Sequence, residues 1–135
     1  MATQYAMKWT VDLPFEEAQQ QVREALKEEG FGIITEIDVR ATLKEKLNVE
    51  TTPYLILGAC QPALAHQALE LEPDIGVLLP CNVVVRQANR RTEIAAFDPE
   101  TGLAMAGNPN LDALGKEVRS RIQRALDRIA APVST

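Results

Sequence analysis

Apolar and polar residues alternate at the start of the chain, which is the period of a half-buried strand. From residue 5 to residue 11 the odd positions are apolar, while Lys8 and Thr10 point the other way. Further strands are predicted at 31–38, 53–60, 75–85 and 92–97. The run 75–85 is apolar at both odd and even positions, so it is expected to be a central strand covered on both faces, with a bulge or an edge exchange at Pro80.

Between these strands, apolar residues recur at every third or fourth position, as in amphipathic helices. Helices are predicted from Pro14 to a left-handed stop at Gly30, at 62–71 and at about 110–131. A turn or short helix is expected from Asp98-Pro99 to Gly107. The last helix has the most regular apolar positions, which are Leu111, Leu114, Val118, Ile122, Ala125 and Ile129.

A shorter helix is predicted at 39–47, with Asp38 as its N-cap. Val39, Leu43 and Leu47 would form its buried stripe.

The order of these elements predicts an α+β fold. The short loop between 75–85 and 92–97 makes that pair of strands antiparallel, and neither a linker nor an internal repeat divides the sequence. A chain of 135 residues is long enough to bury a core by itself. We therefore expect a single domain over 1–135 with its core at about 5–131, in which about five mainly antiparallel strands pack against the first and last helices.

Charge and composition narrow the possible functions. The net charge is −5, and nucleic-acid binding depends largely on Lys and Arg, so no nucleic-acid partner is expected. The N-terminal residues do not resemble a signal peptide and no apolar stretch is long enough to span a bilayer, so we expect no membrane partner and a cytoplasmic location. Cysteines in such a protein are expected to be reduced.

Two cysteines provide the sharpest chemical feature. Cys60 and Cys81 each end or interrupt an apolar run, and each is followed by a carboxamide residue, Gln61 or Asn82. One interpretation is a reactive site, in which the helix that begins at Pro62 would lower the pKa of Cys60. The other interpretation is simple packing, because free cysteine is often buried.

Carboxylates complete the candidate site. If the sheet brings them together, Glu36 and Asp98 would converge with the two thiols at one end of it. The preferred alternative for Glu36 is a position on a solvated face, and the tendency of Asp-Pro to form turns explains Asp98 by itself. The candidate ligand-binding residues are Glu36, Cys60, Cys81, Asn82 and Asp98. His66 is expected on a helix surface, and its spacing from Cys60 does not suit a zinc site, so neither a metal nor a cofactor is predicted.

Six short segments, taken together and in their order along nearly the whole chain, resemble the domain-of-unknown-function family 302. These segments are 13–18, 35–38, 41–47, 54–60, 78–85 and 98–99. The resemblance implies a small bacterial or archaeal stand-alone domain with a curved sheet similar to the TATA-binding-protein-like class, and it implies no established activity. Gln61 departs from the asparagine expected after the first cysteine.

Two functions are compatible with these residues. The first is a protein that binds an unknown small molecule or protein partner, without catalysis of its own, and that forms a homodimer. The second is a thiol-dependent protein for redox sensing or sulfur transfer through Cys60 and Cys81. The first is preferred, because no base or cofactor motif accompanies the thiols. A basic stripe at Arg121, Arg124 and Arg128 is expected to be solvated, or else to meet the acidic first helix of a partner or an anionic ligand.

Overall fold

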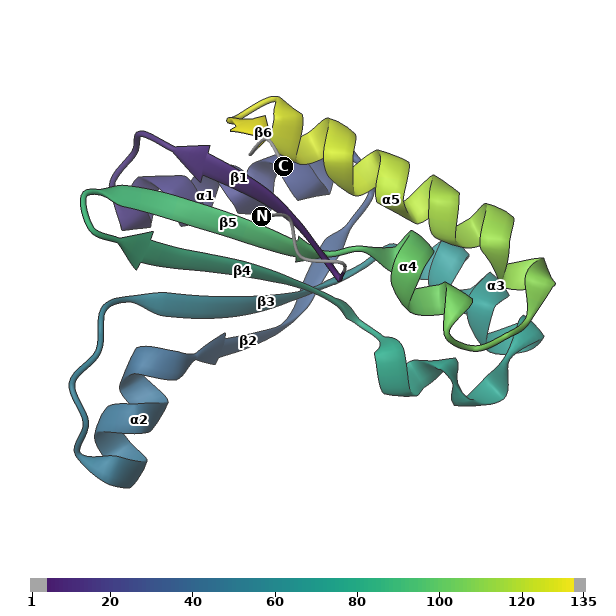
Figure 1. Ribbon diagram of the computed structural model, residues 1–135, viewed down its shortest axis with the longest axis horizontal. Helices are drawn as coiled ribbons and strands as arrows, with labels where there is room; N and C mark the ends of the chain where they lie inside the picture. The colour runs from purple at the N-terminus through teal and green to yellow at the C-terminus, as the bar shows by residue number, and fades with distance from the viewer. Residues whose placement is uncertain (1–4, 133–135) are drawn as a thin grey trace.

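One antiparallel sheet organises the structure, a computed structural model that describes residues 5–132 (Figure 1). Its strands are β1 (Ala6–Val11), β2 (Gly32–Asp38), β3 (Tyr54–Cys60), β4 (Cys81–Ala88), β5 (Arg91–Phe97) and β6 (Ala131–Pro132). They lie in the order β2-β3-β4-β5-β1-β6, and every neighbouring pair is antiparallel. The predicted α+β fold is confirmed, and the two-residue strand β6 adds to the strands that the sequence predicts.

Helices α1 and α5 lie together against one face of this sheet, whereas α3, α4 and η1 gather at one of its ends (Figure 1). The α-helices are α1 (Phe15–Glu28), α2 (Val39–Leu47), α3 (Pro62–Leu71), α4 (Pro99–Ala104) and α5 (Asp112–Asp127). Two 3₁₀ helices, η1 (Pro73–Leu78) and η2 (Pro109–Leu111), precede β4 and α5. The predicted helices are confirmed, and Gly30 has the expected positive φ after α1.

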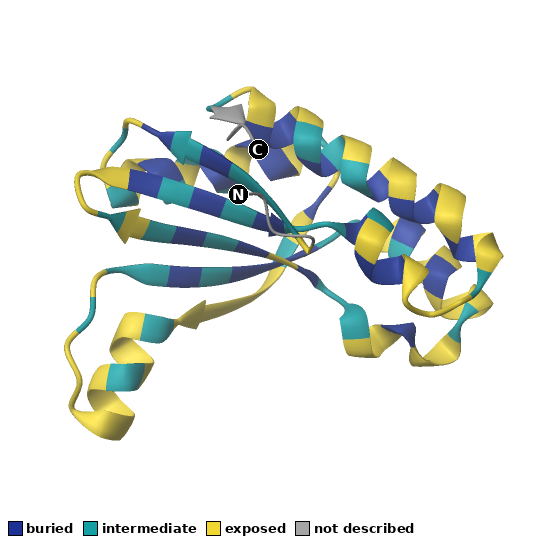
Figure 2. Ribbon diagram, viewed as in Figure 1, coloured by how far each residue is buried: buried dark blue, intermediate teal, exposed yellow. Residues whose placement is uncertain are grey.

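The core lies between the sheet and the two long helices. Alternate strand residues, Trp9, Leu57, Val83 and Ile94 among them, are almost fully buried on this inner face, and the intervening residues remain partly exposed (Figure 2). From α5 the core receives Leu114, Val118, Ile122, Ala125 and Leu126, and Ile129 packs at its border. The burial predicted for the last helix is therefore confirmed, with Ile129 only partly buried.

A hydrogen bond fixes α5 to the sheet. The indole Nε1 of Trp9 donates to Oδ1 of Asp127 at 2.8 Å. A buried indole N–H without an acceptor would carry a desolvation cost, so this contact specifies where the end of α5 lies relative to β1.

The prediction of one long strand at 75–85 is wrong. Residues up to Leu78 belong to η1, and β4 begins only at Cys81. Pro80 has no backbone N–H to donate to a ladder, so it stands immediately before the strand. Within η1, Ile75 is 2% exposed and Val77 is 87% exposed, so this apolar run only partly enters the core.

Helix α2 also differs from its prediction. Asp38 caps it as expected, since its side chain accepts a hydrogen bond from the N–H of Ala41. However, α2 contains no buried residue, and Leu47 is 66% exposed. The helix projects beyond the edge strand β2 (Figure 1), so its apolar stripe is only partly covered, with Val39 and Leu43 half-buried and Leu47 exposed.

The basic stripe of α5 meets the acidic end of α1 within the same chain. Arg124 and Arg128 both form ion pairs with Glu29, and these pairs lower the pKa of the Glu29 carboxyl below its usual value. Arg121 pairs with Glu117 of its own helix at 3.3 Å. These partners account for the stripe without a second molecule. Within residues 5–132, no helix has the length and apolar character needed to cross a membrane.

We expect Val118→Asp to lower the free energy of unfolding by several kcal/mol, because it places a carboxylate in the core beneath α5. Ser120→Asp adds the same charge to the exposed surface of this helix and should change stability by less than about 0.5 kcal/mol. Urea unfolding followed by circular dichroism measures both. Equal stability of the two variants would contradict the packing described for α5.

Candidate functional site

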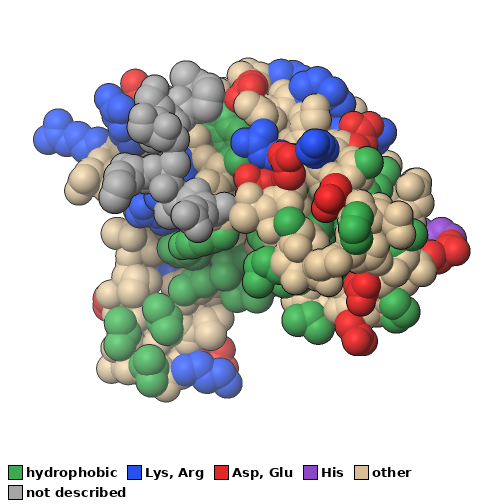
Figure 3. All heavy atoms as spheres, turned by 45° about the vertical axis from the view of Figure 1, so that its right-hand side comes forward, with side chains coloured by type: hydrophobic (Ala, Val, Ile, Leu, Met, Phe, Trp, Pro, Cys, Tyr) green, Lys and Arg blue, Asp and Glu red, His purple; other side chains and the backbone are tan. Residues whose placement is uncertain are grey.

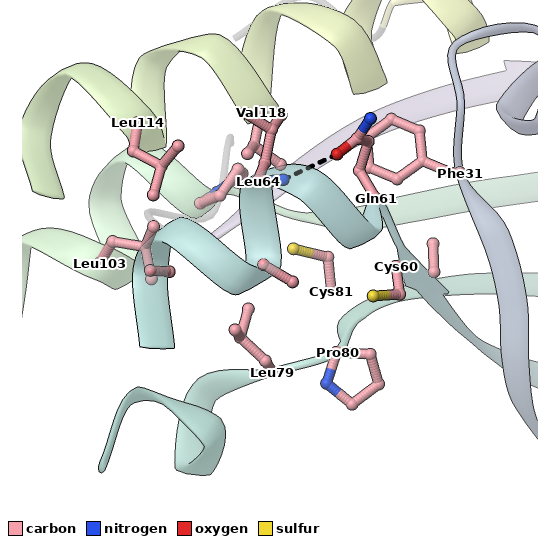
Figure 4. Close-up of a pocket in the computed structure, with 14 residues that line it drawn as sticks. Phe31, Cys60, Gln61, Leu64, Leu79, Pro80, Cys81, Leu103, Leu114 and Val118 are labelled. Carbon is pink, nitrogen blue, oxygen red and sulfur yellow. Dashed lines mark hydrogen bonds between the residues drawn. The ribbon is translucent and has the colours of Figure 1, made fainter. Parts of the chain in front are cut away.

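The two cysteines lie on neighbouring strands at the same end of the sheet. Cys60 is the last residue of β3 and Cys81 the first of β4, where Cys81 lies opposite Ala59. Both thiols are free. Figure 4 shows their sulfur atoms beside one apolar pocket, which we call the thiol pocket. The matching sequence frames of the two cysteines thus correspond to adjacent positions in the fold.

The thiol pocket is small and almost entirely apolar. Its volume is about 40 Å³, which is room for one or a few water-sized groups. Side chains from β3, β4, α3, α4, α5 and the segment between η1 and β4 close it, including Leu64, Leu79, Leu103, Leu114 and Val118. Pockets for drug-sized ligands are roughly 300–1,000 Å³, so this one does not accommodate a typical organic substrate.

The surroundings of Cys81 keep its thiol protonated. Burial, together with a smaller contribution from the nearby Cys60, raises the pKa of Cys81 to about 12. The residues that line the thiol pocket include no Lys, Arg or His. At the N-terminus of α3, the Gln61 side chain accepts the hydrogen bond of the Leu64 N–H at 2.8 Å, so the cap of this helix is a carboxamide.

The carboxylates predicted for the site, Glu36 and Asp98, are not among the residues that line the thiol pocket. Glu36 stands on the edge strand β2 and pairs with Arg23 of α1 at 2.9 Å, beside a separate polar cleft. Asp98 caps α4 and pairs with Arg119 at 3.2 Å. Each carboxylate therefore has a structural partner. His66 is exposed on α3 as predicted, and it pairs with Glu70.

Asn82 lies on the opposite face of the sheet from Cys81, where a second and much larger concavity opens. This concavity, which we call the sheet hollow, has a volume of about 580 Å³. Its walls and floor come from β1, β3, β4 and β5, together with Tyr5. Hydrophobic side chains gather in a recess on this side of the molecule (Figure 3).

A continuous row of side chains crosses the sheet on this outer face. The strand registers place Ile37 opposite Ile56, Ile56 opposite Val84, Val84 opposite Ala95, and Ala95 opposite Lys8. The row is therefore apolar over four strands and ends in a cation at β1. Val84, Ala95 and Lys8 of this row line the sheet hollow.

A polar row runs beside the apolar one. Tyr54, Arg86, Glu93 and Thr10 stand opposite one another along it, and Arg86 forms an ion pair with Glu93. On the other side of the apolar row, Asn82 lies opposite Gly58. The sheet hollow thus combines an apolar floor with a few polar groups at its borders.

Sequence reasoning found Asn82 but missed the sheet hollow around it. The signal was present in the outward positions of the strands, where Val84 and Ala95 are apolar. These apolar residues could not be interpreted from the sequence alone, because an apolar residue on the outer face of a sheet indicates either a second layer that covers this face or an open surface for a ligand.

Comparisons with known proteins identify relatives of this fold. The family described as a domain of unknown function, DUF302, matches residues 7–129. The crystal structure of an uncharacterized conserved DUF302 protein from Bacillus stearothermophilus is similar, with 31% sequence identity and a TM-score of 0.88. The similarity covers 94% of this chain and 99% of that chain. A comparison with curated proteins found no match.

We expect Cys81 in the native protein to resist alkylation by iodoacetamide at neutral pH, because its raised pKa leaves almost no thiolate. Its reaction should remain slow up to about pH 10 and become fast only on unfolding. Mass spectrometry of the Cys60→Ser variant isolates this cysteine, and the same variant in urea is the control. Fast native labelling near neutral pH would contradict the assignment of Cys81 as a buried thiol.

Proposed function

The chain belongs to the DUF302 family of domains of unknown function, and we propose that it is a small-molecule-binding protein whose ligand occupies the sheet hollow, without catalysis of its own. One observation carries this proposal. The outer face of the sheet has a hollow of about 580 Å³ lined by strand residues, and no described helix fills it.

The size and chemistry of the sheet hollow suit such a ligand. Binding sites for small molecules are usually concavities of roughly 300–1,000 Å³ with apolar walls and a few polar groups that fix orientation. Val84, Ala95 and Phe97 provide apolar surface here, and Lys8 and Asn82 provide polar groups.

The floor of the sheet hollow is also well supported. Strands β4 and β5 are interior strands of the sheet, and their other face carries Val83, Val85 and Ile94, which are fully buried in the core. Because both strands are paired on each side, a ligand would meet a surface formed in advance. Less binding free energy would then be lost to ordering the protein.

Thiol-dependent redox sensing or sulfur transfer is the second candidate. The shared position of Cys60 and Cys81 beside one pocket favours it. The protonated state of Cys81 and the absence of a cation or histidine among the lining residues of the thiol pocket weigh against it, since thiol chemistry requires the thiolate. We therefore prefer the binding function.

Three expectations from the sequence accompany this proposal as predictions. They are a cytoplasmic location, a homodimer, and no binding to nucleic acid at physiological salt. Light scattering of the purified protein measures the second, and gel-shift titration with duplex and single-stranded DNA measures the third.

We expect the neutral dye N-phenyl-1-naphthylamine to bind the folded protein with increased fluorescence, because the sheet hollow offers it an apolar surface. Val84→Glu places a carboxylate on the floor of the sheet hollow and should weaken dye binding at least about tenfold without unfolding the protein, as Val84 is only partly buried.

Val77→Glu is the matched control, because Val77 is also an apolar residue but is 87% exposed on η1, outside the sheet hollow. It should bind the dye as the unmodified protein does. If the folded protein does not bind the dye, or if Val84→Glu binds it unchanged, the sheet hollow is not the binding site.

A further inference from the structure

Lys8 occupies a distinctive place in the sheet hollow. It points outward from β1, opposite Ala95, at the end of the apolar row that continues through Val84 and Ile56. Its side chain is only half-buried, and it lines the sheet hollow. A cationic group thus adjoins an apolar floor in the same concavity.

Lys8 differs from the other cations in being half-buried without an ion pair among the described residues. The sequence contains 14 Lys and Arg residues, all within the described part, and most of them form ion pairs. Those for which no ion pair is found among the described residues are Lys8, Lys27, Arg40, Lys46, Arg90 and Lys116. Of these six, only Lys8 is not exposed to solvent.

An exposed lysine needs no partner, because water solvates its ammonium group. A half-buried lysine has lost part of this hydration. An anion that binds there stabilises the ammonium group through a charge-assisted hydrogen bond. The other charges that line the sheet hollow do not compete for Lys8. Glu93 is the acidic residue among them, and its carboxylate already pairs with Arg86.

We propose that the ligand of the sheet hollow is a small organic anion with an apolar body, such as a monocarboxylate. Its carboxylate binds the ammonium group of Lys8, and its hydrocarbon part lies over Ala95 and Val84. This inference rests on the proposed function, and it adds the chemical class of the ligand. The charge of the whole protein is −5, so recognition depends on the local placement of Lys8 and not on the overall field.

Octanoate and octanamide test this inference, because they have the same chain length and differ in head-group charge at neutral pH. Isothermal titration calorimetry of the full chain at low salt should show octanoate binding about tenfold more tightly than octanamide. Lys8→Met keeps the apolar stem and removes the charge, so it should abolish this preference. Lys8→Arg should retain it.

Lys116→Met is the matched control, since Lys116 also forms no ion pair with another described residue but is exposed on α5, away from the sheet hollow. It should leave both affinities unchanged. Thermal unfolding of each variant checks that the fold is intact. The preference for octanoate should also decrease as salt is added, as for a partly exposed ion pair.

The outcomes separate this inference from the proposed function. Equal binding of octanoate and octanamide, or an unchanged preference in Lys8→Met, overturns the assignment of an anion, whereas binding of the neutral dye at Val84 still supports a ligand site. If the dye does not bind either, the proposed function fails together with the inference. A preference that Lys8→Met abolishes and Lys8→Arg keeps supports both.

Discussion

Packing of both long helices against one face of the sheet is the constraint on which the rest of the structure depends. Side chains of an antiparallel strand alternate between the two faces, so covering one face divides each strand into a buried set and an open set. Trp9, Val83 and Ile94 belong to the buried set, and Lys8, Val84 and Ala95 to the open set. The same division that forms the core therefore also forms the sheet hollow, and the proposed ligand would lie on the opposite face of the strands that carry the core residues.

Much of this architecture could be predicted from the sequence, because each element contains its own periodic pattern. The helices and the α+β class follow from apolar spacing, from the cap at Asp38 and from the stop at Gly30. Two features depended on tertiary packing. The apolar run at 75–85 resembles one buried strand, yet the segment before Pro80 turns away as η1. The stripe of α2 resembles a buried face, yet this helix extends past the edge of the sheet.

The candidate site was harder to predict than the fold, because its chemistry depends on burial. The sequence singled out Cys60 and Cys81, but only the structure shows that they lie on neighbouring strands and that burial raises the pKa of Cys81 to about 12. Glu36 and Asp98 are charged residues whose partners, Arg23 and Arg119, lie on distant helices. Lys8 had no distinguishing mark in the sequence. Its significance comes from the absence of an ion pair at a half-buried position among the described residues.

The most direct test of this account is to locate a bound monocarboxylate by nuclear magnetic resonance. The backbone amide resonances of the folded protein would be followed during titration with octanoate. The account predicts that the largest shifts occur on the outer face of the sheet, at Lys8, Val84 and Ala95 and their neighbours in the sheet hollow. Shifts concentrated instead at the thiol pocket, around Leu64, Cys81 and Leu103, or no shifts at millimolar octanoate, would contradict it.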